Sequence, residues 1–214
     1  MLAQYSMGIY YTYGYGGLKK DPKEAFEYFK KAADKGNAEA MTRVAEAYMS
    51  GIGTEMNRYS AFNNFLKAAN LGEQDAMFKV ALAYQNGYGT DKDYAKAFKW
   101  YKKLAELGNT SAQNNLGSMY QNGQGVVKDE AEGFKWFLKA ANAGAAFSMR
   151  IVAGCYYEGT GVDCDITKAF EWWKKAAESG DKYSMHNLAI CYEAGLGTAK
   201  DASAAEYWNE QERN

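Results

Sequence analysis

A repeat of 36 residues dominates the sequence and constrains the fold more than any other feature. The triplet Gly-x-Gly occurs six times, with a step of 37 residues once and 36 thereafter, starting at Gly14, Gly51, Gly87, Gly123, Gly159 and Gly195. A second marker, a small residue usually followed by Phe, keeps a step of 36 throughout, at Ala25, Ala61, Ala97, Gly133, Ala169 and Ala205. We call a set of equivalent positions in successive copies a column. Two columns with a common period predict an array of stacked units, because no single unit could bury its apolar face alone.

Each copy is predicted to form two helices. In the second copy Ala40, Val44 and Tyr48 fall on one helical stripe, which indicates a helix from about residue 40 to Ser50. The next helix should begin after a residue that caps helix N-termini, found every 36 residues at Asp21, Asn57, Asp93, Asp129, Asp165 and Asp201. Glycines are expected to end both helices of each copy. The first helix ends at the Gly-x-Gly triplet, and the second ends at Gly36, Gly72, Gly108, Gly144 or Gly180. The fold class is therefore all-α.

Composition excludes several classes of protein. The 25 basic and 26 acidic residues leave a net charge of −1, so nothing draws the chain toward nucleic acid. No run of eighteen apolar residues is present, so no integral membrane segment is expected. The first residues lack the basic region and the A-x-A cleavage site of a secretory leader. This slightly favours a cytoplasmic location, with export as the alternative if a leader has been removed.

The aromatic and cysteine residues also follow the repeat. One column holds Phe29, Phe65, Tyr101, Phe137 and Trp173. Such a stripe predicts packing between stacked repeats rather than a cofactor site. Cys155 and Cys191 are equivalent in neighbouring copies and are expected to be small buried residues, whereas Cys164 lies in a connection. A Cys155–Cys164 disulfide is the alternative that the sequence leaves open.

The best copy of the repeat runs from Ala112 to Gly144 and contains Leu116-Gly117, Tyr120, Gly123, Lys128-Asp129 and Lys139-Ala140-Ala141. This pattern resembles the Sel1-like repeat, a relative of the tetratricopeptide repeat, and the resemblance covers essentially the whole chain. It implies a right-handed α-α superhelix, or solenoid, of six helix-turn-helix repeats in a single domain over residues 1–214. The repeats are expected at approximately 1–36, 37–72, 73–108, 109–144, 145–180 and 181–214.

The resemblance also implies a function, because members of this family mostly act as adaptors that assemble protein complexes, many of them in bacteria. The expected partner is therefore another protein or a peptide, with no nucleic acid. The resemblance further implies that the first helix of each repeat lines a concave groove.

Few residues in the sequence could support catalysis, a metal site or a cofactor, so we expect none of the three. His186 is the sole histidine and stands in a variable column that otherwise holds Thr42, Phe78, Asn114 and Arg150, which predicts an exposed contact residue. The serine-lactamase motif S-x-x-K occurs once, at Ser179–Lys182, across a predicted helix end and without its companion motifs. A β-lactamase-like or peptidoglycan-related hydrolase is accordingly the least favoured function.

Variable columns on the first helices are the predicted binding surface. Amide side chains can donate to and accept from a peptide backbone, and aromatic side chains supply rigid anchors. The predicted groove residues are Phe78, Leu82, Gln85, Asn86, Asn114, Ser118, Gln121, Asn122, Phe147, Arg150, Tyr157, Tyr183 and His186.

The N-terminal segment suggests a second hypothesis. It is unusually apolar for the end of a repeat array, where a polar outer face is usual. The chain is therefore alternatively expected to self-associate, as a homodimer formed through Leu2, Tyr5 and Ile9.

Overall fold

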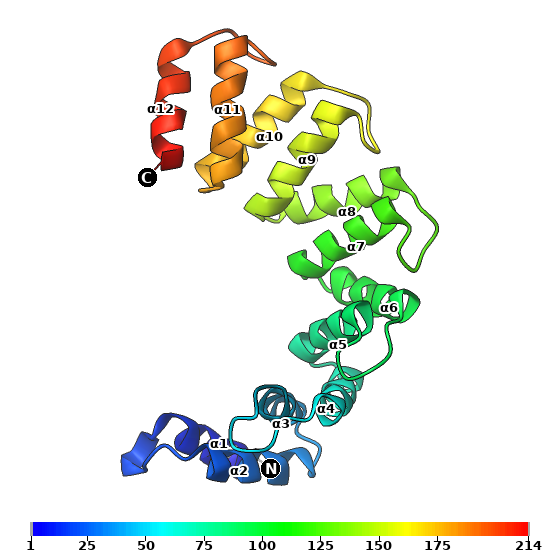
Figure 1. The fold of residues 1–214 in the computed structure, drawn as a ribbon, viewed down its shortest axis with the longest axis vertical. Helices are drawn as coiled ribbons and strands as arrows, with labels where there is room; N and C mark the ends of the chain where they lie inside the picture. Colours follow the sequence, from blue (N-terminus) through cyan, green and yellow to red (C-terminus); the bar gives the residue numbers. More distant parts are fainter. Residues whose placement is uncertain (1, 214) are drawn as a thin grey trace. The chain divides into compact units, whose positions relative to one another are not determined.

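A computed structural model describes residues 2–213 of the chain. Over these residues it contains twelve α-helices, one short 3-10 helix and no strand, which confirms the all-α prediction (Figure 1). The helices form two compact units, residues 1–104 and 105–214, each containing consecutive helix pairs. The boundary between the units falls inside one helix.

The first unit is built from six helices and the 3-10 helix. In chain order these are α1 (Leu2–Tyr13), η1 (Tyr15–Gly17), α2 (Pro22–Ala33), α3 (Ala38–Ser50), α4 (Arg58–Asn70), α5 (Gln74–Asn86) and α6 (Tyr94–Glu106), the last of which contains the boundary. Each helix from α1 to α4 packs against the next one along the chain. The odd-numbered helices are the first helices of the repeats and the even-numbered ones the second helices.

The second unit repeats this organisation. Its helices are α7 (Thr110–Asn122), α8 (Glu130–Asn142), α9 (Ala146–Glu158), α10 (Ile166–Glu178), α11 (Lys182–Ala194) and α12 (Ala202–Arg213). Successive helices again pack against one another from α7 to α12.

The six predicted caps all act as caps. Asp21 accepts hydrogen bonds from the backbone N–H groups of Lys23 and Glu24, at 3.0 and 3.1 Å. The other five each accept from the N–H group three residues ahead, at 2.9 or 3.0 Å: Asn57, Asp93, Asp129, Asp165 and Asp201. These bonds satisfy donors that have no partner within the helix, so every second helix starts where its cap predicts.

The Gly-x-Gly connections end the first helices, and their two glycines have different roles. Gly51 ends α3 with a left-handed backbone (φ 72°), which a residue with a side chain rarely adopts. Gly53 lies so close to the carbonyl group of Pro22, at the start of α2, that a Cβ atom would collide with it. The second glycine therefore lets the connection pack against the preceding repeat.

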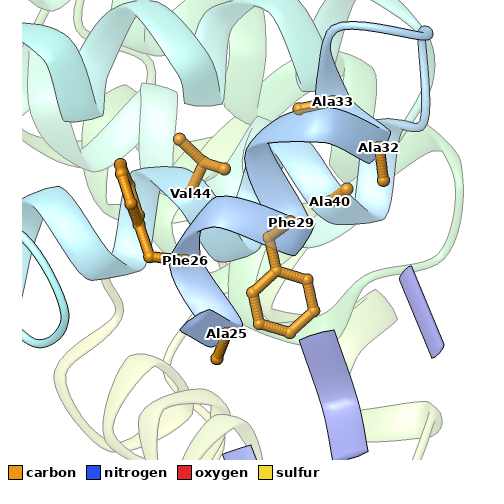
Figure 2. Packing of buried hydrophobic residues seen from close by; sticks show 7 residues of the cluster. All are labelled: Ala25, Phe26, Phe29, Ala32, Ala33, Ala40 and Val44. Carbon is orange, nitrogen blue, oxygen red and sulfur yellow. The ribbon is translucent and has the colours of Figure 1, made fainter. Parts of the chain in front are cut away.

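Alanines and aromatic rings form the core, as Figure 2 shows for the first repeats. Ala32 and Ala40 are fully buried, which lets the helices approach closely, and the Phe29 ring is buried beside them. Phe26 meets Tyr48 edge to face with ring centroids 5.3 Å apart. The same Phe–Tyr contact recurs at 36-residue steps, in the pairs Phe62–Tyr84, Phe134–Tyr156 and Phe170–Tyr192. The prediction that aromatic rings pack between repeats is confirmed.

The cysteines are all free. Cys155 and Cys191 are buried as predicted, and burial raises the pKa of each thiol to about 11. Cys164 is exposed, and its thiol lies 3.3 Å from the carbonyl oxygen of Tyr157. The structure therefore contains the buried thiols and not the alternative disulfide.

Candidate interaction surface

The predicted groove residues all lie on first helices, but they differ in exposure. Six are exposed: Asn86, Asn122, Phe147, Tyr157, Tyr183 and His186. Seven are half-buried: Phe78, Leu82, Gln85, Asn114, Ser118, Gln121 and Arg150. The column that holds His186 is not a surface column throughout, because Thr42 is buried and its hydroxyl group donates to Glu73 at 3.0 Å.

In the first unit two of the half-buried residues, Phe78 and Gln85, contact Tyr101 on the second helix of their repeat. Phe78 packs edge to face on Tyr101, with ring centroids 5.7 Å apart. The Tyr101 hydroxyl donates to Oε1 of Gln85 at 2.7 Å, and burial raises the pKa of this tyrosine well above its usual range. Phe78 and Gln85 are therefore already engaged in the fold and have less freedom to contact a ligand.

Several amides of the predicted groove are engaged within their own helices. Asn86 donates from Nδ2 to the carbonyl oxygen of Leu82 at 3.1 Å, and Asn122 donates likewise to that of Ser118 at 2.8 Å. Oδ1 of Asn114 is buried without a hydrogen-bond partner among the described residues. Fewer amide groups are therefore free to bond to a peptide than the sequence suggests.

Arg150 occupies the centre of the surface in the second unit. Its guanidinium group lies between two rings, 5.0 Å from the centroid of Phe147 on α9 and 4.6 Å from that of Tyr183 on α11. Its Nε atom is 3.7 Å from Oδ2 of Asp181, too long for a hydrogen bond. The rings of Phe147 and Tyr183 are themselves 52% and 70% exposed. A cation held this way is available to a ligand.

Next to Arg150 the surface is hollowed between α9 and α11. This hollow, which we name the Trp173 pocket, has a volume of about 370 Å³ and is lined by Arg150, Gly154, Tyr157, Glu158, Trp173, Asn187, Ile190, Cys191 and Leu196. Trp173 comes from α10, and its ring lies 5.4 Å from that of Tyr157. Four of the lining residues come from one face of α9. The pocket therefore lies on the surface predicted from the variable columns.

Gly154 keeps the Trp173 pocket open. A Cβ atom at this position would meet nothing within 4 Å. The other glycines inside first helices are different, because a Cβ at Gly8 or Gly117 would collide with the ring of Phe29 or Phe137. The absence of a side chain at residue 154 thus serves no packing contact among the described residues.

A hollow at the equivalent repeat position is present in the first unit. It has a volume of about 260 Å³ and lies between α1 and α3, over Phe29, the residue equivalent to Trp173. Ile9 takes the place of Gly154 there, and Arg43 and Glu46 on α3 form an ion pair at 3.0 Å along its edge. Each unit therefore has a hollow between first helices, with an aromatic ring from a second helix at its base.

The residues predicted for self-association are placed differently from one another. Leu2 is exposed, whereas Tyr5 and Ile9 are half-buried and pack against the core cluster of the first repeats. The Tyr5 ring lies 5.6 Å from that of Phe29. Homodimer formation through this end stays a prediction, and Leu2 is the residue of the three with the most accessible side chain.

The residues considered for chemistry do not come together. Nδ1 of His186 is 3.2 Å from Oε2 of Glu212, in an exposed pair. The hydroxyl group of Ser179, the C-cap of α10, donates to the carbonyl oxygen of Lys175 at 2.9 Å. Residues 2–213 contain no group of three or more His, Cys, Asp or Glu side chains that could hold a metal ion. Over the same residues, none of the helices has the length and apolar character needed to cross a membrane.

Comparison with known families places these features in a class of repeat proteins. The Sel1 repeat family model matches residues 2–37, 38–73, 74–109, 110–144, 146–181 and 182–210. The chain therefore belongs to the Sel1 repeat family, which confirms the resemblance seen in the sequence. Proteins of this family generally act as scaffolds for protein interactions and are generally not catalysts.

Two bacterial crystal structures share the fold. One is a protective antigen of uropathogenic Escherichia coli with an SLR fold, which is 32% identical over 99% of this chain and 45% of that chain, with a TM-score of 0.93. The other is a Sel1 repeat protein from Oxalobacter formigenes, 30% identical over 100% of this chain and 85% of that chain, with a TM-score of 0.82. These similarities confirm the solenoid class.

A curated relative comes from a plant. It is the ERAD-associated E3 ubiquitin-protein ligase component HRD3A of Arabidopsis thaliana, 39% identical over 51 residues, which are 24% of this chain and 8% of the relative. The chain thus spans less than half of the Escherichia coli antigen and matches only a small part of the plant protein.

The variable columns place Gly154 on the predicted groove surface, but the pocket that it forms with Trp173 was not predicted from the sequence. A signal was present, because the column of Gly154 otherwise holds Ile9, Glu46, Leu82, Ser118 and Ile190, and a helix interior rarely favours glycine. Trp173 was predicted only as packing, and it is indeed mostly buried while its edge forms the base of a pocket.

Proposed function

We propose that this chain is a non-catalytic scaffold that binds another protein or a peptide through its first helices. One observation carries the proposal: three exposed rings on the adjacent first helices α9 and α11, those of Phe147, Tyr157 and Tyr183, surround Arg150 and the Trp173 pocket. Exposed aromatic side chains clustered beside a pocket are typical of interaction surfaces, and aromatic and Arg residues supply most binding energy at such surfaces.

The family supports this proposal. Sel1 repeat proteins generally bind other proteins, and the plant relative is a component of a ubiquitin ligase. Bound ligands should contact the first helices because the second helices present mainly charged residues to solvent, such as Lys174 and Glu171 on α10.

The proposal is tested with a display library of random twelve-residue peptides selected on the intact chain. Affinities of the selected peptides are then measured for Asn122→Ala, Tyr157→Ala and Tyr183→Ala, with Glu171→Ala and Lys174→Ala on the second helix as controls. We expect the Tyr157 and Tyr183 variants to bind roughly tenfold more weakly, about 1.4 kcal/mol, as for a typical interface anchor. Binding that depends on the controls instead, or a selection that yields no peptide, would contradict the proposal.

A further inference from the structure

We infer that the Trp173 pocket receives one large apolar side chain of a peptide, with an acidic peptide residue at Arg150 and a basic one at Glu158. This inference rests on the proposed function and adds the chemistry of the ligand. It comes from the shape of the pocket and from the charges at its two ends.

The pocket is suited to an aromatic or large aliphatic side chain. Its volume of about 370 Å³ is at the lower end of the range for small-ligand sites and is large enough for such a side chain. The base is the Trp173 ring, tilted by 51° against Tyr157, and Ile190 and Leu196 add apolar walls. A ring entering here would find aromatic partners at its face and edge.

Arg150 provides a carboxylate site at one end. Its guanidinium group lies near the rings of Phe147 and Tyr183, and its Nε atom forms an ion pair with Asp181 at 3.7 Å. Asp181 is itself the N-cap of α11 and accepts hydrogen bonds from the backbone N–H and the hydroxyl of Ser184, at 2.9 and 2.6 Å. The terminal nitrogens of Arg150 thus remain to bind a carboxylate in the two-pronged geometry that guanidinium favours.

Glu158 provides the opposite charge at the other end. It follows Arg150 by eight residues on the same face of α9, which is roughly 12 Å along the helix axis. An extended peptide advances about 3.3 Å per residue. Its acidic and basic residues should therefore be three or four positions apart, with the apolar residue between them.

Gly154 lies midway between these charges, and its lack of a side chain leaves space in the pocket. Leucine or isoleucine occupies its column in three other repeats, at Ile9, Leu82 and Ile190, so the helix tolerates such side chains there. Because a Cβ at residue 154 meets nothing within 4 Å, a side chain can be attached there without a collision at Cβ, and we expect that of leucine to extend into the pocket. This position therefore offers a variant that blocks the ligand and leaves the protein folded.

The test uses peptides from the random library described above. We expect the selected sequences to share an acidic residue, a large apolar residue and a basic residue in this order or its reverse. Gly154→Leu should weaken their binding at least tenfold, whereas Gly154→Ala, whose methyl group leaves most of the pocket open, should change it less than threefold. Circular dichroism and thermal melting of both variants confirm that they fold.

The charges are tested by a double-mutant cycle. Replacing the acidic peptide residue by its amide should weaken binding to the native chain about tenfold and should have little effect on binding to Arg150→Gln, which has no charge to pair with it. Arg150→Lys keeps the charge but loses the planar fork, so it should itself bind several-fold more weakly.

Some results would overturn the inference while leaving the proposed function intact. Unchanged binding to Gly154→Leu, together with weaker binding to Asn122→Ala or Tyr183→Ala, would show a first-helix surface that does not use the pocket. If Gly154→Leu instead abolished association of the chain with itself in sedimentation, the occupant would be a second copy and the peptide assignment would be wrong. Loss of binding only in the second-helix controls would contradict both proposals.

Discussion

Gly154 departs from the rule that glycine in this chain serves the backbone or a close packing contact. It lies inside α9 and has open space above it, whereas Gly117 in α7 is packed against the Phe137 ring, which a Cβ atom would approach to 2.8 Å. Because glycine lowers the stability of a helix interior, Gly154→Ala should raise the free energy of unfolding by about 0.5–1 kcal/mol. Gly117→Ala should lower it. Urea unfolding of the two variants measures both effects, and equal changes in the same direction would contradict this account.

The three thiols should react at very different rates. Cys164 is exposed, while the pKa of about 11 at Cys155 and Cys191 leaves about one thousandth of each as thiolate at pH 8. A thiol reagent should therefore label one cysteine quickly in the native chain and all three in urea. Cys164→Ser should remove the fast phase. Labelling of a single cysteine in urea without reductant would indicate the Cys155–Cys164 disulfide instead.

For single residues, a role that depends on sequence neighbours was predictable from the sequence. A role that depends on how several helices pack together was not. Asp165 caps the helix that follows it by accepting a hydrogen bond from Lys168, three residues ahead. Because the cap involves only neighbouring residues, the sequence pattern was sufficient to predict it. The Trp173 pocket needs an absent side chain on α9, a ring on α10 and a wall from α11 at once. Gln85 shows the same limit, because its engagement by Tyr101 depends on how two helices pack.

Among the first helices of the second unit, α9 stands out as the weakly capped one. Its N-cap is Ala145, which has no side-chain acceptor, and Oγ of Ser148 is fully buried with no hydrogen-bond partner among the described residues. In α11 the equivalent residues, Asp181 and Ser184, bond to each other at 2.6 Å. The same helix carries Gly154, so the element that lines the pocket is also a locally destabilised one.

Restoring the cap should stabilise the chain. Ala145→Asp provides an acceptor for the N–H group and the hydroxyl of Ser148, and we expect a gain of about 1 kcal/mol, or roughly 2–4 °C in melting temperature. Ser148→Ala in the Ala145→Asp background should remove part of this gain. Calorimetry of the single and double variants checks this, and no change in the Ala145→Asp variant would show that α9 is capped in another way.

Helix boundaries were predictable to within about two residues. The stripe from Ala40 placed the start of the helix in the second copy two residues late, because α3 begins at Ala38 after Asn37, whose side chain caps it through the N–H group of Ala40. Its end at Ser50 was correct, since Gly51 has the left-handed backbone that stops the helix.

Over the whole molecule, we propose that the six repeats unfold as one array, as the single-domain prediction requires. The boundary between the compact units falls inside α6, which is held in the first unit by the Tyr101–Gln85 hydrogen bond and in the second by a bond from Gln113 to the carbonyl of Ala105. Four of the five tryptophans lie after residue 105. Tryptophan fluorescence and circular dichroism should therefore give coincident urea transitions, and separate transitions would indicate two independent domains.

The claim that the first helices form the binding surface is tested by hydrogen–deuterium exchange with and without a selected peptide. We expect slower exchange in α9 and α11, with the largest effect in α9 because its weak cap and Gly154 favour local opening in the free chain. Exchange in α10 and α12 should change little. Protection concentrated in the second helices or in the Gly-x-Gly connections, with α9 unchanged, would contradict the claim.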